Sequence, residues 1–511
     1  MAAQPHEIEL KFLVAPARAA GLTKALAGRA AVKTRTLTST YFDTADRALK
    51  AHGMALRVRF DGERRVQTLK AGLVNGGIAR GEWEAPVAGA APDLAKLAET
   101  PAAKLLANGA RLEPVFTVTV ERQEWLRRHG GAQIEFAMDK GEAGEVGDAG
   151  HPAPICELEL ELKAGQTAQL LALAAKVRSE HALTPSFATK AERGFALVDR
   201  ARARARKFDA PHLIAETTAG AAFRAIAKAA LEQIAGNAER LRETPGPEVV
   251  HQMRVGARRL RSTLSTFKAV ADDTRAPAIK AELRWLTGEL DSARNLDVLL
   301  TGAYSRAARK KADTLGLRDL GRRLRIQRAA AYARARSAAE SERLAAFLMD
   351  AIAWLECGPW TSERAAGAAL RERPIGELAA EALERRRAKV ARGGRRIARL
   401  GRQARHQLRI EAKKLRYAAD AFAGLWGHRG RTRKFITALR RLQDRLGELN
   451  DIATAERLAH ELVRGAADAG EADWAAGRLI GGEAAREAAL IVAAADAHAA
   501  LREAKRFWPK I

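Results

Sequence analysis

The chain is poor in cysteine and in aromatic residues. Its 511 residues include two cysteines, Cys156 and Cys357, and the aromatic share is 5%. The two cysteines lie far apart and match no spacing typical of a metal or redox site. They suit a reducing compartment, and the simplest interpretation is that both are small buried residues. We therefore expect a cytoplasmic protein without structural disulfides.

Long apolar runs are also missing. The sequence has no stretch of 18 uninterrupted apolar residues, so it predicts no membrane-spanning helix and no membrane partner. The first residues lack a basic region followed by an apolar segment, so no secretory signal is expected. The hydrophobic share of 47% is still ample for buried cores, and the length allows two or three domains.

Positive charge is concentrated in the second part of the chain. Residues 1–200 carry 27 Lys and Arg against 24 Asp and Glu, whereas residues 201–511 carry 61 against 37. Such an excess attracts a polyanion: nucleic acid, an anionic membrane or polyphosphate. Few aromatic residues accompany the basic runs, so base stacking on single-stranded nucleic acid has little support.

Two segments carry the same alternation of charged and apolar residues. Read as a strand, residues 6–12 place Glu7, Glu9 and Lys11 on one face and apolar residues on the other. Residues 156–163 repeat this pattern with Glu157, Glu159, Glu161 and Lys163. We interpret the two segments as strands that meet in space and hold a divalent metal.

Further strand-like segments between residue 6 and about 163 also place charge on one face. These rows are Arg57 with Arg59; Thr68 with Lys70; Arg80 with Glu82 and Glu84; Arg122 with Glu124; and Glu135 with Asp139. In a half-solvated sheet they would form the outer face. In a barrel wide enough to hold water they would line the interior. Carboxylates would then bind Mg²⁺ or Mn²⁺, and the cations would neutralise a phosphate chain.

The motifs in this part resemble the CYTH family, the triphosphate tunnel metalloenzymes. Residues 7–11 match its ExExK signature. Further blocks follow in the family's order: residues 41–44, 56–59, 68–70, 80–84, 157–163 and 190–194. The resemblance implies an eight-stranded antiparallel tunnel with flanking helices that hydrolyses triphosphates with Mg²⁺ or Mn²⁺, a metal-bound water attacking the terminal phosphorus.

The resemblance also assigns roles to residues. Metal ligands would be Glu7 and Glu9, with Glu159 and either Glu157 or Glu161, while Glu82 and Asp139 complete the acidic side. Phosphates would be held by Lys11, Arg57, Arg59, Lys70, Arg122 and Lys190. The catalytic set would be Glu7, Glu9, Lys11, Lys70 and Glu159.

Residues 216–505 read as helix almost throughout and contain an internal repeat. Residues 251–261 align with residues 406–416. In each copy, apolar residues at helical spacing define a buried face: positions 253, 257, 260, 264 and 267, or 408, 412, 415, 419 and 422. A histidine and three basic residues lie about 100° round from it. Between residues 305 and 400, solvated basic helix is the simplest expectation.

The duplicated pattern resembles the CHAD domain, a conserved-histidine helical domain. The resemblance implies an all-α domain of two helical bundles related by a pseudo-twofold, with a basic pore that binds polyphosphate. The residues carried over are His251, Arg254, Arg258 and Arg261, and His406, Arg409, Lys413 and Arg416. We therefore predict an α+β multidomain protein with a CYTH domain over residues 1–208 and a CHAD domain over residues 216–505.

The first hypothesis for function is a metal-dependent inorganic triphosphatase, with inorganic triphosphate and polyphosphate as partners rather than nucleic acid. One alternative is a polyphosphate-binding protein without turnover, associated with polyphosphate granules. Thiamine triphosphatase and adenylate cyclase activities, which occur among tunnel enzymes, are further alternatives for the same barrel.

Overall fold

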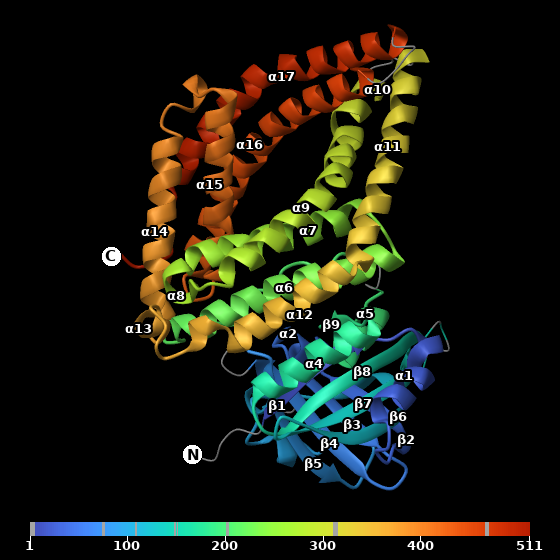
Figure 1. Ribbon diagram of the computed structural model, residues 1–511. Helices are drawn as coiled ribbons and strands as arrows, with labels where there is room; N and C mark the ends of the chain where they lie inside the picture. The colour runs from blue at the N-terminus through green and yellow to red at the C-terminus, as the bar shows by residue number, and fades with distance from the viewer. Residues whose placement is uncertain are drawn as a thin grey trace. The chain divides into compact units, whose positions relative to one another are not determined.

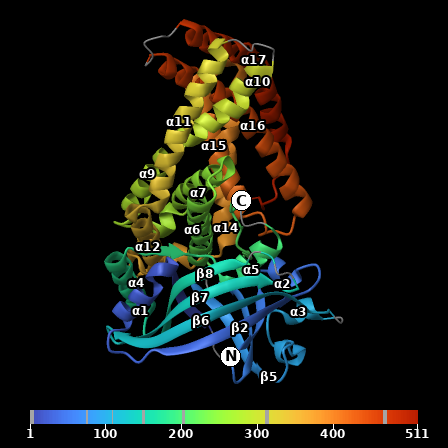
Figure 2. The same ribbon diagram turned by 90° about the vertical axis from the view of Figure 1, so that its right-hand side faces the viewer.

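The computed structural model divides into two compact units (Figures 1 and 2). Unit 1 comprises Met1–Arg206 and Ser341–Thr361, and unit 2 comprises Lys207–Glu340 and Ser362–Ile511. The structure describes residues 6–73, 77–107, 110–147, 150, 152–200, 204–309, 315–464 and 470–510. Among these, no helix is both long and apolar enough to cross a membrane.

Unit 1 is built on a closed antiparallel barrel. Its strands are β1 (His6–Leu13), β2 (Lys33–Asp43), β3 (Ala55–Phe60), β4 (Arg65–Leu73), β5 (Ala79–Val87), β6 (Glu113–His129), β7 (Ala132–Glu145), β8 (Ala153–Ala164) and β9 (Thr184–Ser186). Their order is β5-β4-β3-β2-β6-β7-β8-β1-β9, and pairing of β5 with β1 closes the ring. The predicted eight-stranded antiparallel barrel is confirmed. The short strand β9 is an addition that pairs with β1.

The outer faces of β1 and β8 are apolar because successive side chains of a strand point in opposite directions. Leu10 and Phe12 of β1 and Leu158 and Leu160 of β8 are buried in one cluster. Helices α1 (Ala19–Ala27) and α4 (Thr167–His181) contribute their apolar faces to the same cluster. The charged residues of these strands therefore lie on the inner face, which excludes the alternative of a half-solvated sheet with an outer charged row.

Shorter helices complete the Met1–Arg206 segment. They are η1 (Pro16–Arg18), α2 (Ala48–Ala51), η3 (Leu94–Leu97), α3 (Ala103–Leu106) and α5 (Lys190–Val198). Thr189 caps α5 by accepting a hydrogen bond from the backbone of Glu192, whose side chain accepts one from the backbone of Thr189. This capping box fixes the start of the helix at Lys190.

Helix α12 (Glu342–Cys357), followed by η5 (Pro359–Thr361), belongs to unit 1 although both chain neighbours belong to unit 2. It packs against α4 and β9. Its Met349 and Ile352 are buried in the outer cluster of the barrel. The expectation of solvated helix between residues 305 and 400 is therefore wrong for α12. Cys156 is half-buried and Cys357 is exposed, so the expectation of burial also fails for Cys357.

Unit 2 is helical. Its helices are α6 (Ala219–Glu243), α7 (Pro247–Thr266), α8 (Lys268–Ala271), α9 (Ala276–Leu299), the π-helical turn η4 (Leu300–Tyr304), α10 (Ser305–Arg309), α11 (Leu315–Glu340), α13 (Ala368–Arg371), α14 (Ile375–Gly393), η6 (Ile397–Arg399), α15 (Arg402–Ala421), α16 (Arg429–Arg464) and α17 (Gly470–Glu503). The long helices α16 and α17 lie side by side, and α7 packs on α6, α9 and α15 (Figure 1).

The two copies of the repeat form α7 and α15, which contact each other. All ten apolar positions predicted for their buried faces are buried. Pro247 occupies the first turn of α7, where its missing N–H costs no hydrogen bond. The all-α architecture is confirmed, and the pseudo-twofold relation between two bundles stays a prediction.

Candidate active site

The strand register brings the predicted charged rows together inside the barrel. Glu9 lies opposite Glu161 and Lys11 opposite Glu159 between β1 and β8. Asp139 lies opposite Glu157 between β7 and β8 and opposite Arg122 between β6 and β7. Directly opposed residues share a face, so these side chains all point into the barrel.

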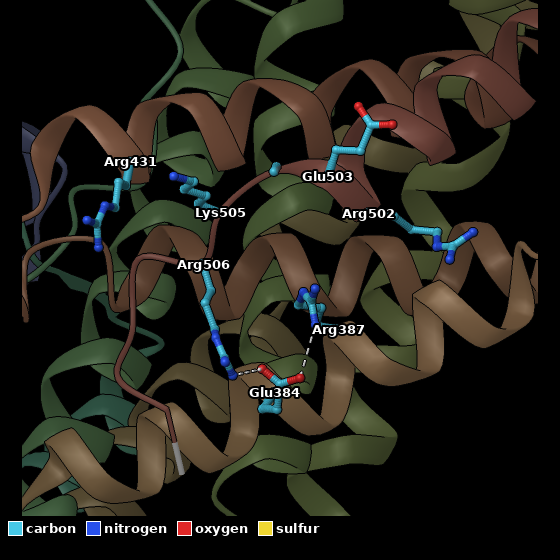
Figure 3. A pocket seen from close by; sticks show the side chains of 8 residues that line it. Glu384, Arg387, Arg431, Arg502, Glu503, Lys505 and Arg506 are labelled. Atoms are coloured by element: carbon cyan, nitrogen blue, oxygen red, sulfur yellow. Dashed lines mark hydrogen bonds and ion pairs between the residues drawn. The ribbon is translucent and has the colours of Figure 1, made fainter.

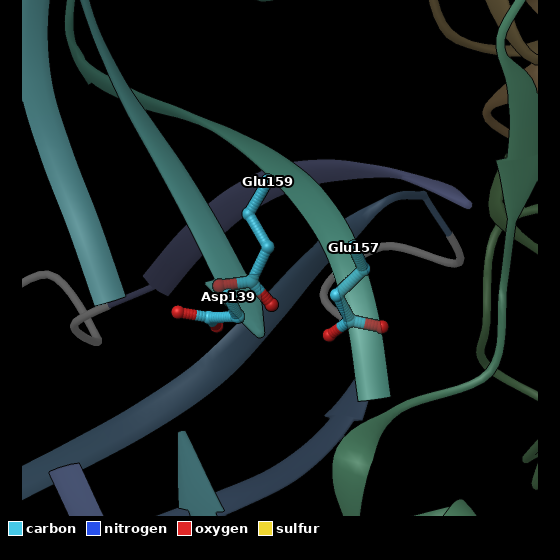
Figure 4. A group of neighbouring side chains, drawn as sticks. All are labelled: Asp139, Glu157 and Glu159. Carbon is cyan, nitrogen blue, oxygen red and sulfur yellow. The ribbon is translucent and has the colours of Figure 1, made fainter. Parts of the chain in front are cut away.

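Three carboxylates form a buried cluster in this interior. Oxygen atoms of Asp139, Glu157 and Glu159 lie within 4.8 Å of one another (Figure 4). Their relative exposures are 0%, 1% and 7%. Three buried negative charges at this spacing are stable only beside cations.

Lys190 supplies one of these cations. Its Nζ lies 2.7 Å from Asp139, 2.6 Å from Glu157 and 2.8 Å from Glu159. Burial alone would lower the pKa of Lys190, but the three carboxylates raise it above its ordinary value. Lys190 is the first residue of α5, so the capping box at Thr189 places its ammonium group.

Arg122 and Lys11 complete the neutralisation. Arg122 donates to both oxygens of Asp139, at 2.7 and 2.6 Å, and to Glu159 at 2.5 Å. Lys11 lies 2.7 Å from Glu159 and 3.0 Å from Glu9. Burial alone would raise the pKa of Glu9, but Lys11 and Lys70 lower it to about 2. Glu9 is thus linked to the cluster through Lys11.

Glu7 and Glu82 share a different cation. Lys70 pairs with Glu7 and lies 3.3 Å from Glu82. Burial raises the pKa of Glu82 above its ordinary value despite Lys70. Since Glu7 and Glu9 lie on the same face of β1, this pair continues the acidic lining beyond the cluster.

Glu161 stands apart from Glu157 and Glu159. It lies 2.7 Å from Lys163, which also lies 3.3 Å from Glu135. Burial, Glu7 and Glu135 raise the pKa of Glu161 to about 7, against the opposite effect of Lys163. Of the three late glutamates, the structure gathers Glu157 and Glu159 with Asp139, and it leaves Glu161 in a neighbouring group.

Arg57 and Arg59 provide positive charge without a close carboxylate. Among the described residues neither makes an ion pair within 4 Å, and the Nε of each has no hydrogen-bond partner although it is buried. Burial, Arg57 and Arg122 lower the pKa of Arg59 to about 10. Buried donors of this kind can be satisfied by an anionic ligand.

Tyr41 is an interior residue to which the sequence analysis gave no role. It lies opposite Arg57 in the β2–β3 register and is buried. Burial opposes its ionisation, but Arg57 and Arg59 lower the pKa of the hydroxyl overall. Alternation along β2, which puts Tyr41 on the same face as Arg35, is the signal that could have found it.

The donor set fits a hard divalent cation. Carboxylate oxygens are the ligands that Mg²⁺ and Mn²⁺ prefer, and the buried Oε2 of Glu157 has no hydrogen-bond partner among the described residues. Asp139, Glu157, Glu159 and Glu9 could hold such an ion. The lysines and arginines that now neutralise them would then be available to phosphate oxygens.

In unit 2, basic residues of α7 and α15 converge. Burial and the neighbouring charges of Arg409, Arg258 and Arg254 lower the pKa of Lys413 to about 6. Burial, Arg294 and nearby cations likewise lower the pKa of His251 to about 4. The acidic residues near this group are Asp291, which pairs with Arg254, Asp451, whose pKa is raised by burial, and Glu248, whose charge acts on His251. The charge of this convergent group suits an anionic ligand.

The other three predicted residues of the stripes lie differently. Arg261 is exposed. His406 is exposed and its Nδ1 lies 2.9 Å from Oδ1 of Asn450. Arg416 donates to Gln443 at 3.1 Å and lies 3.7 Å from Asp420. The sequence repeat therefore overstates the symmetry of the basic group.

Unit 2 contains a second basic region, which the sequence analysis did not predict. It is a cavity of about 490 Å³, with Glu384 paired to both Arg387 and Arg506 (Figure 3). Its lining residues are Glu384, Arg387, Arg431, Arg502, Glu503, Ala504, Lys505 and Arg506. Five cations against two carboxylates make it attractive to anions, but it includes none of the repeat residues.

Comparison with known proteins matches a family model to each of the two parts of the chain. Residues 5–195 match the CYTH domain, and residues 225–460 match the CHAD domain. The chain carries a CYTH domain followed by a CHAD domain. The acidic cluster and Arg57 and Arg59 lie in the first match, and the convergent basic group of α7 and α15 lies in the second.

Two relatives are similar to different parts of the chain. An inorganic triphosphatase of Haemophilus influenzae is 31% identical over 199 residues, which are 38% of this chain and 55% of that protein. The chain thus spans about half the length of this curated relative. The crystal structure of the CHAD domain from the plant Ricinus communis is 30% identical, with a TM-score of 0.51, and the match covers 59% of this chain and 97% of that one.

Proposed function

We propose that the protein hydrolyses inorganic triphosphate with Mg²⁺ or Mn²⁺ inside the CYTH barrel. The observation that carries the proposal is one interior with two kinds of lining. These are the buried carboxylates Asp139, Glu157 and Glu159, and the two arginines Arg57 and Arg59, whose buried Nε atoms have no hydrogen-bond partner among the described residues. The similarity to an inorganic triphosphatase over this domain supports it.

Binding of a metal triphosphate would exchange ion-pair partners. The carboxylates would hold the ion, which would supply neutralisation of phosphate oxygens and activation of water. Lys11, Lys190 and Arg122 leave their carboxylates to hold phosphate oxygens, and Arg57 and Arg59 fill their open donors. Because the groups are buried, they stabilise the charge that develops during transfer without reorganisation of water.

Release of phosphate from tripolyphosphate tests the proposal. Activity should require Mg²⁺ or Mn²⁺ and should be lost in the variant with Glu7→Ala and Glu9→Ala. The matched control is Glu121→Ala with Glu142→Ala, which removes two exposed glutamates from the outer face of the same barrel. Full activity in the first variant would refute the metal assignment. Faster turnover of thiamine triphosphate or ATP than of tripolyphosphate would refute the substrate.

We further propose that the CHAD domain binds polyphosphate through Arg254, Arg258, Arg409, Lys413 and His251. Burial and the neighbouring cations lower the pKa values of His251, Arg258, Arg409 and Lys413, as expected for positive charges held close together, and a bound polyanion would relieve this repulsion. Association with polyphosphate granules inside the cytoplasm would follow from this affinity.

Binding of long-chain polyphosphate to the full chain tests this part. Arg258→Ala with Lys413→Ala should weaken binding by about 100-fold, since two charge-assisted contacts are lost. The control, Arg284→Ala with Arg440→Ala, removes two basic side chains at exposed positions. Equal weakening in the two double variants would indicate a diffuse charge effect and refute the site. DNA that displaces polyphosphate at equal phosphate concentration would also refute it.

A further inference from the structure

One cavity of unit 2 gathers positive charge from residues outside the convergent basic group of α7 and α15. It is the cavity of about 490 Å³ in Figure 3, and we name it the Lys505 cavity. Its lining comes from α14, from α16, and from the end of α17 with the segment that follows, and all of these belong to unit 2. Pockets that hold a small ligand usually have volumes of roughly 300–1,000 Å³. The Lys505 cavity is therefore large enough for a small ligand.

The segment after α17 is fixed in place by aromatic rings. Phe507 and Trp508 are 1% and 3% exposed. The ring centre of Phe435, on α16, lies 5.7 Å from that of Phe507 and 5.0 Å from that of Trp508, with the rings edge to face in both pairs. Burial of two large rings gives this short segment a fixed position. Its neighbours Lys505 and Arg506 therefore project from an ordered backbone, which reduces the entropy that is lost when a ligand binds.

Glu384 holds two of the arginines that line the cavity. Its Oε1 accepts a hydrogen bond from Nη1 of Arg387 at 3.1 Å, and its Oε2 accepts one from Nη1 of Arg506 at 3.3 Å. Trp508 donates its indole N–H to the same Oε2 at 3.2 Å, so the carboxylate itself is held in place. The Nε of Arg387 is buried and has no hydrogen-bond partner among the described residues. One carboxylate shared by two guanidinium groups leaves one positive charge uncompensated.

The other three cations of the cavity are not neutralised by a neighbour. Arg431, Arg502 and Lys505 are exposed, and in the described part of the chain none of them forms an ion pair with a carboxylate. Figure 3 shows Lys505 directed towards Arg431. The second lining carboxylate is Glu503, so the lining carries five cations and two carboxylates, a net charge of +3. Like charges gathered at one place repel each other, and a bound anion relieves that repulsion.

The chemistry of the lining suits a compact phosphate anion. A guanidinium group matches the geometry of phosphate oxygens, and an ammonium group adds a point charge. Cations from α14, from α16 and from the segment after α17 can each meet a different oxygen, which suits two linked phosphate groups better than one. None of the described lining residues is aromatic, so a nucleobase would find no ring on which to stack. An inorganic condensed phosphate therefore fits the lining better than a nucleotide.

We propose that the Lys505 cavity binds an inorganic diphosphate group through Arg387, Arg431 and Lys505. Free diphosphate and the end of a longer phosphate chain both present this group. The cavity shares no lining residue with the basic group of α7 and α15. Binding in the cavity therefore requires neither hydrolysis of triphosphate in the barrel nor binding of polyphosphate by that group.

Hydrogen exchange of the full chain, in EDTA and with increasing concentrations of inorganic diphosphate, tests this site. Residues 505–508 lie outside the helices, so their backbone amides exchange and should be protected when the anion binds. The diphosphate concentration that gives half of this protection measures binding at this cavity, even if diphosphate also binds elsewhere. Arg431→Ala with Lys505→Ala should raise that concentration by about tenfold or more, because two charge-assisted contacts are lost.

The matched control is Arg433→Ala with Lys434→Ala. It removes the same two residue types from exposed positions of α16 that do not line the cavity. The half-saturating concentration should change by less than about threefold in this variant, since the salt of the buffer screens charges at a distance. Equal effects of the two double variants would refute the site, and so would the absence of protection by millimolar diphosphate.

Two further anions identify the ligand. Protection of residues 505–508 by long-chain polyphosphate, at the same concentration of chain ends, would support the end of a chain as the ligand. Protection by diphosphate but not by long-chain polyphosphate would support the free anion. Inorganic phosphate that half-saturates the site at the same concentration as diphosphate would refute the assignment to a diphosphate group.

Discussion

Lys190 neutralises the buried carboxylates of the barrel interior. Its ammonium group lies within 2.8 Å of oxygens from three buried carboxylates. Such a group is costly to bury unless every charge is balanced, and each carboxylate gains a competing partner when a metal binds. The same ion pairs therefore stabilise the fold, and they are the pairs that would exchange partners when the substrate binds.

Replacement of Lys190 by methionine should lower the free energy of unfolding of unit 1. Loss of one partner from a buried charge group costs about 3–5 kcal/mol, because the other charges stay uncompensated. Mg²⁺ should then raise the melting temperature of Lys190→Met more than that of the wild type, since a bound ion replaces the missing charge. Thermal unfolding with and without Mg²⁺ measures this. Lys163→Met, at a more exposed position, is the control and should behave like the wild type.

The late glutamates should differ in their importance. Glu157→Gln and Glu159→Gln should each lower the turnover of tripolyphosphate by at least about 100-fold. Loss of a residue that only supports a metal ligand already costs up to about 100-fold, and loss of a ligand itself should cost at least as much. Glu161→Gln, which lies in the neighbouring group with Lys163 and Glu135, should lower it by less than about threefold. Titration of activity with Mn²⁺ measures the effect on metal affinity. If Glu161→Gln changed the Mn²⁺ concentration needed for activity more than Glu157→Gln and Glu159→Gln did, the assignment of Glu157 and Glu159 as metal ligands would be contradicted.

Lys413 should make polyphosphate binding dependent on pH. Its pKa in the free protein is about 6, because of burial and of Arg409, Arg258 and Arg254, while Asp451 acts in the opposite direction. A bound polyanion favours the charged form and raises this pKa, so binding takes up a proton above pH 6. Affinity should therefore fall by up to about tenfold per pH unit between pH 6 and 8. Lys413→Arg stays charged, so its affinity should change less with pH in the same titration.

At the scale of elements, α12 shows that a domain core need not come from a continuous segment. In the sequence, α12 lies between two stretches of unit 2, but its apolar residues cover part of the barrel of unit 1. Removal of this helix would expose the outer side of the core around α4 and β9. Residues 1–208, the predicted CYTH domain, would thus lack a piece of the packing seen in the structure.

Ile352→Ala should destabilise unit 1 by about 2–4 kcal/mol, the usual cost of a cavity at a buried isoleucine. The unfolding transition of the barrel, followed by protection of β1 and β8 amides from hydrogen exchange, measures this cost. Val492→Ala on α17 is the control, since Val492 is 61% exposed and its truncation leaves no cavity. Unchanged protection of β1 in Ile352→Ala would contradict the role of α12 in the core.

At the scale of the whole molecule, the distribution of charge differs between the parts that carry the two proposed activities. Most of the net charge of +27 comes from residues 201–511, and the barrel is nearly balanced. A balanced interior suits an ion-pair exchange with a small metal-bound substrate. An uncompensated surface suits a long polyanion that releases many counterions.

Salt should therefore affect the two activities differently. With four or five cations at the basic group, log K for polyphosphate should fall with log[salt] with a slope of about −3. KM for tripolyphosphate should change less, because buried pairs are screened less than exposed ones. Binding and steady-state rates measured in the same series of salt concentrations test this difference. Equal slopes would indicate that one surface serves both anions.

The sequence by itself determined the elements and the chemistry of the interior. Strict alternation at residues 7–11 and 157–163 can only place charge on one face and apolar residues on the other, because successive side chains of a strand point in opposite directions. The helical repeat likewise fixed the buried faces of α7 and α15. These features depend on local periodicity, so no tertiary information was needed.

Only the tertiary structure decided which of these residues meet. Register grouped Glu157 and Glu159 with Asp139 and left Glu161 beside Lys163, a choice that a uniform stripe cannot encode. Packing separated Arg258 and Lys413 from Arg261 and Arg416 although the repeat treats them alike. It also placed α12 on the barrel. Contacts between distant segments depend on how whole faces fit together, and local sequence patterns do not contain that information.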